Sequence, residues 1–364
     1  MTTDTIRVDR AALEDFCARV FQAHNLSEAD ATIAADVLVA ADARGIPSHG
    51  VARLPRYVLG LATGLMLTDV EPEIVRETPT SLLVNARGAM GAPVSAHTMN
   101  SVIDKARQTG AAFGCIRDSN HFGIAGYYAM LALPADMLGI AMTNTAALGV
   151  PTFGREPFFG TNPLAFAAPA DEEGAFVLDM ATTVVTRGKV EVYDRAEKPL
   201  PEGWAVDAAG LAATDPTLIL QNLTVQAGGG ILPLGGLGEL FSGHKGYGLA
   251  VMVDILCGVL AGSSFGADIA DQAGSSARVS HFFGAIRIDT FRDPRAFRRD
   301  MDHLLRSLRS SPPAEGEERV YFAGLKEFEY EEACAREGIP LTPKVYAQLK
   351  ETGAASGIAP PAVL

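Results

Sequence analysis

The sequence predicts an α/β protein with a mixed β-sheet, and two observations lead to that prediction. First, strand-like and helical segments alternate along most of the 364 residues, which is typical of layered α/β folds. Second, "GIAMTN" (139–144) and "LAFAAP" (164–169) are joined by a loop without a crossover helix, which favours antiparallel neighbours. The length also suggests two lobes rather than one core.

The first sixty residues read as helices. Residues 9–25 place Leu13, Phe16, Cys17, Val20 and Phe21 on one apolar stripe. A second helix follows over 26–45, with Ser27 as the N-cap and Asp30 three residues later. After a proline turn, a third helix is expected from about Val51.

The central part of the chain reads as strands around a helix. The pattern predicts strands at 81–86 and 111–118, with a helix at 93–110 between them. Strands dominate from Leu138 and include 175–181. Residues 203–238 read as loop with two glycine clusters, and no structure is predicted for 217–230. Helices are expected at about 245–261, 294–310 and 330–338, with a surface linker at 310–318.

Composition excludes several classes of protein. The formal net charge of -13 repels nucleic acid and acidic membranes. The four cysteines are far apart, so neither a disulfide framework nor a zinc site is expected, and a reducing cytoplasm fits best. The N-terminus has no apolar signal region. The most apolar segment, 249–261, is too short to span a bilayer and carries Asp254. The seven scattered histidines indicate no metal centre.

The segment "CIRDSNHFGIAGYYAML" (115–131) is the first candidate site. A helix beginning near residues 123–125 would present free backbone N–H groups, which can bind a phosphate. Gly123 would let a ligand approach the backbone closely. The alternative is an ordinary capped turn in which His121 is only a loop histidine.

The segment "DARGIPSHGVARLPRY" (42–57) is the second candidate. The imidazole of His49, beside Ser48, can move a proton near neutral pH, and Arg53 one helical turn later can hold a carboxylate. This combination suits a 2-oxo or 2-hydroxy acid. The alternative is that Ser48 caps a helix and Arg53 lies on a solvated face.

Two further segments are candidates for coenzyme binding. Asp179 ends a predicted strand, where it could accept from a ribose hydroxyl or could cap a helix. His244 and Lys245 follow glycines at a helix start, as in a phosphate-binding loop. No GxGxxG joins a strand to a helix, so a Rossmann dinucleotide site is not expected.

Six segments stand in the same order as in the malate/L-lactate dehydrogenase-like oxidoreductases, and the chain resembles that family over nearly its whole length. The family includes sulfolactate, ureidoglycolate and diketogulonate dehydrogenases and Δ1-piperideine-2-carboxylate reductases. The matching segments are "RGIPSHGVARLPRY" (44–57), "SNHFGIAGYYAM" (119–130), "GTNPLAFAAP" (160–169), "LDMATTVVTRGKVEV" (178–192), "PLPEGWAVDAAG" (199–210) and "GHKGYGLAVMVDILCGVLAGSSFG" (243–266).

The resemblance implies a three-layer α/β/α cofactor domain with a mixed seven-stranded sheet, distinct from the Rossmann fold, and a second domain built from both chain ends. The expected NAD(P)-binding domain is 119–294. The expected substrate and dimerisation domain is 1–118 with 295–364. The protein is expected to be a homodimer in the cytoplasm, acting on a small carboxylate with NAD or NADP as coenzyme, with no nucleic-acid or membrane partner.

The resemblance also implies roles for individual residues. Ser48 resembles a relay serine and His49 a proton donor, with His121 as the other candidate for that role. The substrate contacts implied are Arg53, Thr161 and Arg187. The coenzyme contacts implied are His121, Phe122, Gly123, Ile124, Ala125, Thr145, Asp179, Met180, Ala181, His244, Lys245, Arg319, Ala323 and Gly324.

Two departures from the family pattern affect the functional prediction. Lys189 stands where the cyclic-imine reductases carry an aspartate, which favours a 2-oxo or 2-hydroxy acid. The family's "PGE" turn is replaced by Ala323, Gly324 and Leu325. The predicted reaction is hydride transfer between nicotinamide and C2 of such an acid. The alternatives are a cyclic-imine 2-carboxylate reductase and a non-catalytic dinucleotide-binding protein.

Overall fold

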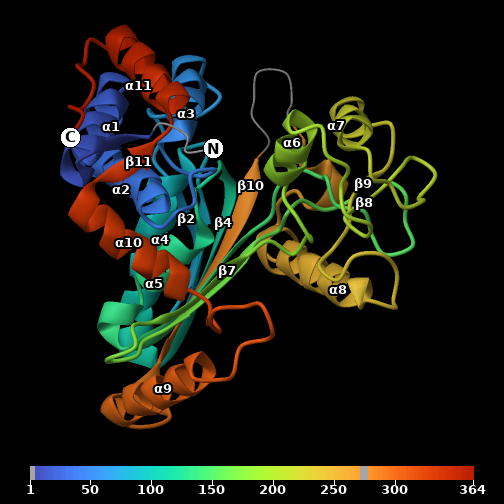
Figure 1. Ribbon diagram of the computed structural model, residues 1–364. Helices are drawn as coiled ribbons and strands as arrows, with labels where there is room; N and C mark the ends of the chain where they lie inside the picture. The colour runs from blue at the N-terminus through green and yellow to red at the C-terminus, as the bar shows by residue number, and fades with distance from the viewer. Residues whose placement is uncertain (1–4, 271–277) are drawn as a thin grey trace.

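A seven-stranded mixed sheet forms the centre of the protein, with strand order β2-β3-β4-β10-β5-β6-β7 (Figure 1). The structure is a computed structural model that describes residues 5–270 and 278–364; residues 1–4 and 271–277 of the two predicted domains lie outside this range. The strands of this sheet are β2 (Glu73–Thr78), β3 (Ser81–Asn85), β4 (Ala111–Ser119), β5 (Met137–Thr143), β6 (Leu164–Ala168), β7 (Phe176–Met180) and β10 (Val279–Arg287).

Eleven α-helices surround the sheet in the described part of the chain. They are α1 (Arg10–Ala23), α2 (Glu28–Ala43), α3 (Leu54–Ala62), α4 (Gly91–Thr109), α5 (Ala125–Met130), α6 (Arg187–Arg195), α7 (Pro216–Val225), α8 (Gly243–Asp254), α9 (Pro294–Arg309), α10 (Leu325–Glu337) and α11 (Pro343–Ala355). Two small sheets pair β1 (Ile6–Val8) with β11 (Ile339–Leu341) and β8 (Ala205–Val206) with β9 (Gly230–Ile231).

The predicted mixed sheet is confirmed. Strands β3 and β4 are parallel and are joined by α4, as the strand, helix, strand pattern predicted. Strands β5 and β6 are antiparallel, as the loop between them indicated. The predicted cap of α2 is also confirmed, because the Ser27 hydroxyl accepts a hydrogen bond from the Asp30 N–H at 3.1 Å.

Alternate side chains of β10 face opposite sides of the sheet. Phe283 packs in a core with Met99 of α4 and Tyr128 of α5. Phe282 packs in a second core with Val253 of α8 and with Cys257 of the π-helical turn that follows. This alternation follows from the period-two geometry of a strand, and it places helices on both faces of the sheet.

The two ends of the chain share one hydrophobic core. Val8 and Phe16 from the N-terminal segment pack in the same cluster as Cys334, Leu341 and Leu349 from the C-terminal segment. Strand β1 pairs with β11, which joins the two segments, and Figure 1 shows α1 and α2 beside α10 and α11. The predicted boundary at 118/119 falls within β4, and strands from both sides of it share the large sheet.

Several elements differ from the sequence prediction. Strand β10 was not predicted, although it is central in the sheet, because most of its residues are buried on both faces and show no alternation. The predicted loop at 203–238 contains α7, whose N-cap Asp215 accepts from the Thr217 and Leu218 N–H groups. This helix also explains the unassigned segment 217–230. Helix α10 begins five residues before the predicted position, and α6 and α11 were not predicted.

No helix among residues 5–270 and 278–364 is long and apolar enough to cross a membrane. All four cysteines are free and buried.

Candidate active site

The loop after α2 brings three predicted residues together. The Ser48 hydroxyl lies 2.9 Å from His49 Nδ1, and Arg53 Nε donates to the Ser48 carbonyl oxygen at 2.7 Å. Residues 51–53 form a short 3₁₀ helix, η1, that runs directly into α3. Gly50 occupies the N-cap position of η1, and the first N–H of η1, that of Val51, donates to the Asp42 side chain rather than to Ser48. Ser48 therefore contacts the imidazole instead of capping the helix.

The second candidate imidazole lies against the first. The rings of His49 and His121 are stacked, with centroids 5.5 Å apart and an interplanar angle of 23°. The Tyr57 hydroxyl lies 2.5 Å from His121 Nδ1, and the Gly123 N–H donates to the same nitrogen at 3.3 Å. An Nδ1 that accepts from Gly123 carries no proton, so the neutral ring carries its proton on Nε2. No protein partner of Nε2 is found in the described part of the chain.

The electrostatics of this pair favour neutral imidazoles and a bound anion. Burial, and then the nearby Arg53 guanidinium, lowers the pKa of His49 to about 4. Burial also lowers the pKa of His121 well below its usual value, and His49, Arg53 and Arg56 act in the same direction. The fixed charges around the two rings are therefore guanidinium cations. A carboxylate entering here meets complementary charge.

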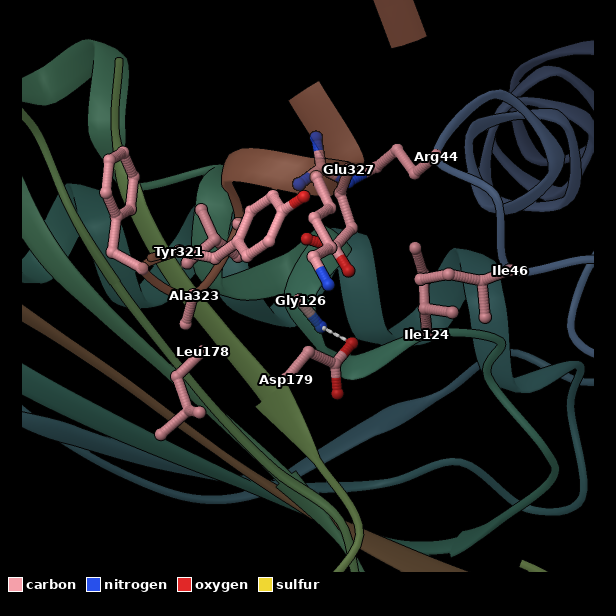
Figure 2. Close-up of a pocket in the computed structure, with 13 residues that line it drawn as sticks. Arg44, Ile46, Ile124, Gly126, Leu178, Asp179, Tyr321, Ala323 and Glu327 are labelled. Carbon is pink, nitrogen blue, oxygen red and sulfur yellow. Dashed lines mark hydrogen bonds between the residues drawn. The ribbon is translucent and has the colours of Figure 1, made fainter. Parts of the chain in front are cut away.

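A pocket of about 320 Å³ is lined in part by residues of the two segments that carry the imidazoles (Figure 2). Ile46 and Ile124 line it, and each lies three residues along the chain from one of the two histidines. Predicted coenzyme residues from three distant segments meet in this pocket. The lining residues are Arg44, Ile46, Ile124, Gly126, Val177, Leu178, Asp179, Tyr321, Phe322, Ala323, Gly324, Lys326 and Glu327.

Asp179 at the end of β7 caps the start of α5. Its Oδ2 accepts from the Gly126 N–H at 2.7 Å, while Figure 2 shows the second carboxyl oxygen pointing away from Gly126. The Gly126 N–H at the start of this six-residue helix is therefore already bound by a carboxylate of the protein, and a phosphate at residues 123–125 would have to use other donors. The carboxyl is reachable through the pocket, but surrounding protein raises its pKa to about 6.

The two cationic side chains of the pocket contact other protein groups. Arg44 donates to Glu331 at 3.0 Å, and its guanidinium lies 4.4 Å from the centre of the Phe328 ring. Lys326 Nζ lies 3.8 Å from the centre of the Tyr321 ring. Of the charged groups in the pocket, Arg44 lowers the pKa of Asp179 and Glu327 raises it.

The predicted loop 121–125 is tightly packed. The Phe122 ring stacks on the buried His281 ring at 4.4 Å between centroids. Gly123 has φ of +88°, and a Cβ at this position would lie 2.5 Å from Val37. Ile124 and Ala125 are also buried. The loop that carries His121 is therefore fixed by its packing against His281 and Val37.

The start of α8 differs from the start of α5. Its N-cap Ser242 has φ of 67° and makes no side-chain cap, and the Lys245 N–H donates to the Ser242 carbonyl oxygen at 2.9 Å. His244 and Lys245 are exposed. Gly243 packs against backbone, since a Cβ there would lie 2.0 Å from the Gly236 carbonyl oxygen. This helix start presents two exposed side chains, one of them an ammonium group, that an anion could contact.

Thr145 and Thr161 lie beside each other near the end of β7. The Thr161 N–H donates to Thr145 Oγ1 at 3.0 Å, and the Thr182 N–H donates to the Thr161 carbonyl at 2.9 Å. Met180 and Ala181, both half-buried, connect Asp179 to Thr182. These predicted contacts therefore form one continuous surface with Asp179.

Two predicted contacts have their guanidinium groups engaged elsewhere. Arg187, at the start of α6, pairs with Glu191 at 3.2 Å and donates to Thr224 of α7 at 3.3 Å. Arg319 pairs with Glu329 and lies 4.6 Å from the centre of the Tyr321 ring. Ala323 contributes its carbonyl to the Val177 N–H at 3.0 Å, and Gly324, with φ of +98°, begins α10.

Sequence reasoning missed Tyr57, His281 and Arg44. Tyr57 is four residues after Arg53, and that helical spacing could have placed both on one face. His281 lies in the unpredicted strand β10, and nothing in its neighbourhood in sequence marked it. Its ring nitrogens lie 2.8 Å from Thr143 Oγ1 and 2.9 Å from Ser119 Oγ.

The side chains present fit a dinucleotide better than a metal ion. Among residues 5–270 and 278–364, no group of three histidine, cysteine or carboxylate side chains could hold a metal. The pocket offers a carboxylate acceptor suited to ribose hydroxyls, and the α8 start offers N–H donors and an ammonium group suited to phosphate.

Comparisons with known proteins identify similar chains over the full length. The family model described as "Malate/L-lactate dehydrogenase" matches residues 8–350. A malate dehydrogenase of Pyrococcus horikoshii is 41% identical over 353 residues, covering 97% of this chain and 96% of the relative. The ureidoglycolate dehydrogenase (NAD(+)) of Escherichia coli K12 is 33% identical over 349 residues, covering 94% and 95%. The crystal structure of a malate dehydrogenase from Entamoeba histolytica superposes with a TM-score of 0.94 at 32% identity, covering 99% of this chain and all of the other.

Proposed function

Because the chain belongs to the malate/L-lactate dehydrogenase family and is a 2-hydroxyacid dehydrogenase, we propose that it transfers a hydride between NAD(P) and C2 of a small 2-oxo or 2-hydroxy acid. Membership confirms the resemblance seen in the six segments and sets aside the non-catalytic alternative. The observation that carries the proposal is the stacked pair His49 and His121 beside Arg53. A pair of imidazoles next to a guanidinium suits proton movement on a carboxylated substrate.

A bound nicotinamide coenzyme supplies the hydride in reduction and accepts it in oxidation. We assign its phosphates to the start of α8, with Lys245 and His244, and a ribose hydroxyl to the free oxygen of Asp179. The exposed Lys245 and His244 at the start of α8 and the pocket position of Asp179 support this assignment. Ile124, Ala323 and Gly324 would form the walls around the coenzyme.

Arg53 is proposed to hold the substrate carboxylate. Its Nε is fixed on the Ser48 carbonyl, so the rest of the guanidinium is oriented before substrate arrives. Orientation of this kind lowers the barrier by keeping the reacting carbon in one position. The bound carboxylate also adds negative charge beside the imidazoles, which raises their pKa and favours the protonated ring needed for reduction.

His121 is proposed to move the proton at the substrate oxygen through Nε2. Tyr57 suits both states of the ring, because its hydroxyl can donate to an unprotonated Nδ1 and accept from a protonated one. His49 packs against the ring and lies next to Ser48. A pH–rate profile of His49→Gln and of His121→Gln tests this assignment, since the ionisation of the donor is lost only when the donor itself is replaced.

The substrate class is tested with NADH and NADPH against oxaloacetate, pyruvate and Δ1-piperideine-2-carboxylate. Turnover of a 2-oxo acid is expected, and Lys189 argues against the imine. Turnover of the imine alone would contradict the proposal. Arg53→Ala should lower kcat/KM for the 2-oxo acid by at least about 100-fold. Arg107→Ala, an exposed arginine paired with Asp104, is the control and should retain wild-type kcat/KM.

The expected homodimer and domain assignment remain part of the proposal. Ile255, Val259 and Leu260 follow α8 and are 50%, 52% and 60% exposed, and an apolar patch of this kind supports a subunit interface. Light scattering of the full chain would measure the oligomeric state. The shared core of the two chain ends supports a substrate domain made from both. The free thiols agree with a reducing cytoplasm.

A further inference from the structure

A buried carboxylate lies directly beneath the loop that carries His49. Asp42, in the last turn of α2, is 5% exposed. Its Oδ2 accepts a hydrogen bond from the Val51 N–H at 2.6 Å. In the described part of the chain, no hydrogen bond joins Asp42 to either imidazole. Asp42 is therefore not one of the reacting groups.

The bond between Asp42 and Val51 closes a loop. The chain leaves α2 at Ala43 and returns to the Asp42 side chain at Val51, the first residue of η1. The closed loop carries Ser48 and His49. The helix that begins at Val51 continues into α3 and carries Arg53 and Tyr57. The hydrogen bond from Val51 to Asp42 therefore fixes the position where the loop with Ser48 and His49 meets the helix with Arg53 and Tyr57.

The approach of Asp42 depends on a glycine. A Cβ on Gly50 would lie 2.2 to 2.3 Å from the carboxyl carbon and both oxygens of Asp42. Gly50 does not have a positive φ, so conformational freedom is not the reason for a glycine here. Space for the carboxylate is the reason.

The surroundings of Asp42 make its ionisation costly. In the described part of the chain, no cation pairs with it. The titratable groups facing it are the Cys17 thiol of α1 and the Tyr330 phenol and Cys334 thiol of α10, and the pKa of each is raised. All three are therefore neutral around pH 7. Burial raises the pKa of Asp42 to about 7, against the opposing effect of the Val51 N–H.

Asp302 offers a useful contrast within the same protein. Its carboxylate is also 5% exposed and also accepts from backbone N–H groups, those of Asp171, Glu172 and Glu173. Those N–H groups and the Arg306 guanidinium keep its pKa below the usual value. Asp302 thus has the partners expected of a structural clamp, whereas Asp42 has one hydrogen bond and no cation.

We propose that Asp42 is a positioning residue for catalysis: through the Val51 N–H it sets the loop bearing His49 and the helix bearing Arg53 and Tyr57. The inference rests on the proposed function for the reaction it serves. Its structural part, the closing of residues 44–51, is independent of which substrate is turned over.

Three variants test the proposal. Asp42→Asn keeps the shape and an acceptor oxygen but removes the charge, and kcat should fall about 10-fold with little change in coenzyme KM. Asp42→Ala removes the acceptor, and kcat should fall about 100-fold. Gly50→Ala displaces the carboxylate from the other side and should resemble Asp42→Ala. Asp302→Asn is the matched control, with a lowered Tm and a wild-type kcat.

Two readouts separate positioning from general loss of structure. The ratio of wild-type to Asp42→Asn kcat/KM should increase as the pH rises through about 7, because only the wild type gains a charge-assisted bond there. Amide hydrogen exchange should be faster in residues 45–57 of each Asp42 variant and unchanged elsewhere.

The outcomes discriminate between the proposals. Faster exchange in residues 45–57 with wild-type kcat in Asp42→Asn and Gly50→Ala would overturn the positioning role. Unchanged exchange would overturn the closing of the loop. If wild-type protein turns over no 2-oxo acid, the proposed function fails, and hydrogen exchange still tests whether Asp42 holds the segment.

Discussion

The starts of α5 and α8 were both predicted as phosphate sites, but the structure fills only one of them with protein. At α5, the Asp179 carboxylate accepts from the Gly126 N–H, and the preceding loop is fixed by Phe122 on His281. At α8, the N-cap residue Ser242 makes no side-chain cap, and Lys245 is exposed. A glycine next to a helix start therefore indicates a possible anion site. A carboxylate from another strand, such as Asp179, can take the place of an external anion at that site.

The two helix starts should differ in how they respond to substitution. Changes to the imidazoles near α5 should act mainly on kcat, whereas a change at Asp179 leaves the imidazoles in place and should act on coenzyme KM. Changes at α8 remove groups proposed to bind the coenzyme phosphates and should act mainly on coenzyme KM.

The largest effect is expected near α5. His121→Gln should lower kcat about 1000-fold, because general acid–base catalysis by a positioned side chain contributes on this scale. Steady-state kinetics at saturating coenzyme measures this, and coenzyme KM should change little. A larger loss of kcat in His49→Gln than in His121→Gln would transfer the proton role to His49.

An intermediate effect is expected at α8. Lys245→Ala should raise coenzyme KM about 10-fold with kcat nearly unchanged, because one charge-assisted contact to phosphate is removed. Lys344→Ala, an exposed lysine at the start of α11, is the charge-matched control. Equal coenzyme KM in the two variants would place the phosphates away from α8.

The smallest effect is expected at the cap of α5. Asp179→Asn keeps an acceptor for Gly126, so coenzyme KM should rise only about threefold. Because the folded pKa of about 6 is above the unfolded value, wild-type stability should fall as the pH rises from about 4 to about 6. Thermal unfolding across this range measures the fall, which should be weaker in the Asn variant. An identical pH dependence would show that Asp179 does not titrate as described.

Local patterns predicted much of the fold and part of the site. Period and capping signals located α2, α4 and the strands flanking α4, because those signals lie within each element. Strand β10 shows no alternation of apolar and polar residues, since helices cover both of its faces. Its sequence therefore could not be distinguished from that of loops and linkers. Helix α7 was hidden by flanking glycines, although Asp215 and Pro216 mark its start.

In the site, the sequence predicted groups of residues that are close along the chain, but it did not predict contacts between residues that are far apart along the chain. Ser48, His49 and Arg53 lie within one turn and loop, so spacing alone brought them together. Tyr57 and His121 are 64 positions apart, and Gly126 and Asp179 are 53 apart. No single-sequence pattern joins such pairs, and the tautomer of His121 and the capping of α5 both depend on them.

The core shared by the chain ends bears on how the protein matures during synthesis. The helices around His49 emerge from the ribosome before the large sheet is complete, but the strand and helices that complete their core, with Ile339, Leu341 and Leu349, emerge after it. Leu364 even donates its N–H to the Arg7 carbonyl. The residues around His49 therefore cannot complete their core until Leu349 has been synthesised, and nascent chains that stop before Ile339 would contain all strands of the large sheet but lack part of the core behind the catalytic loop.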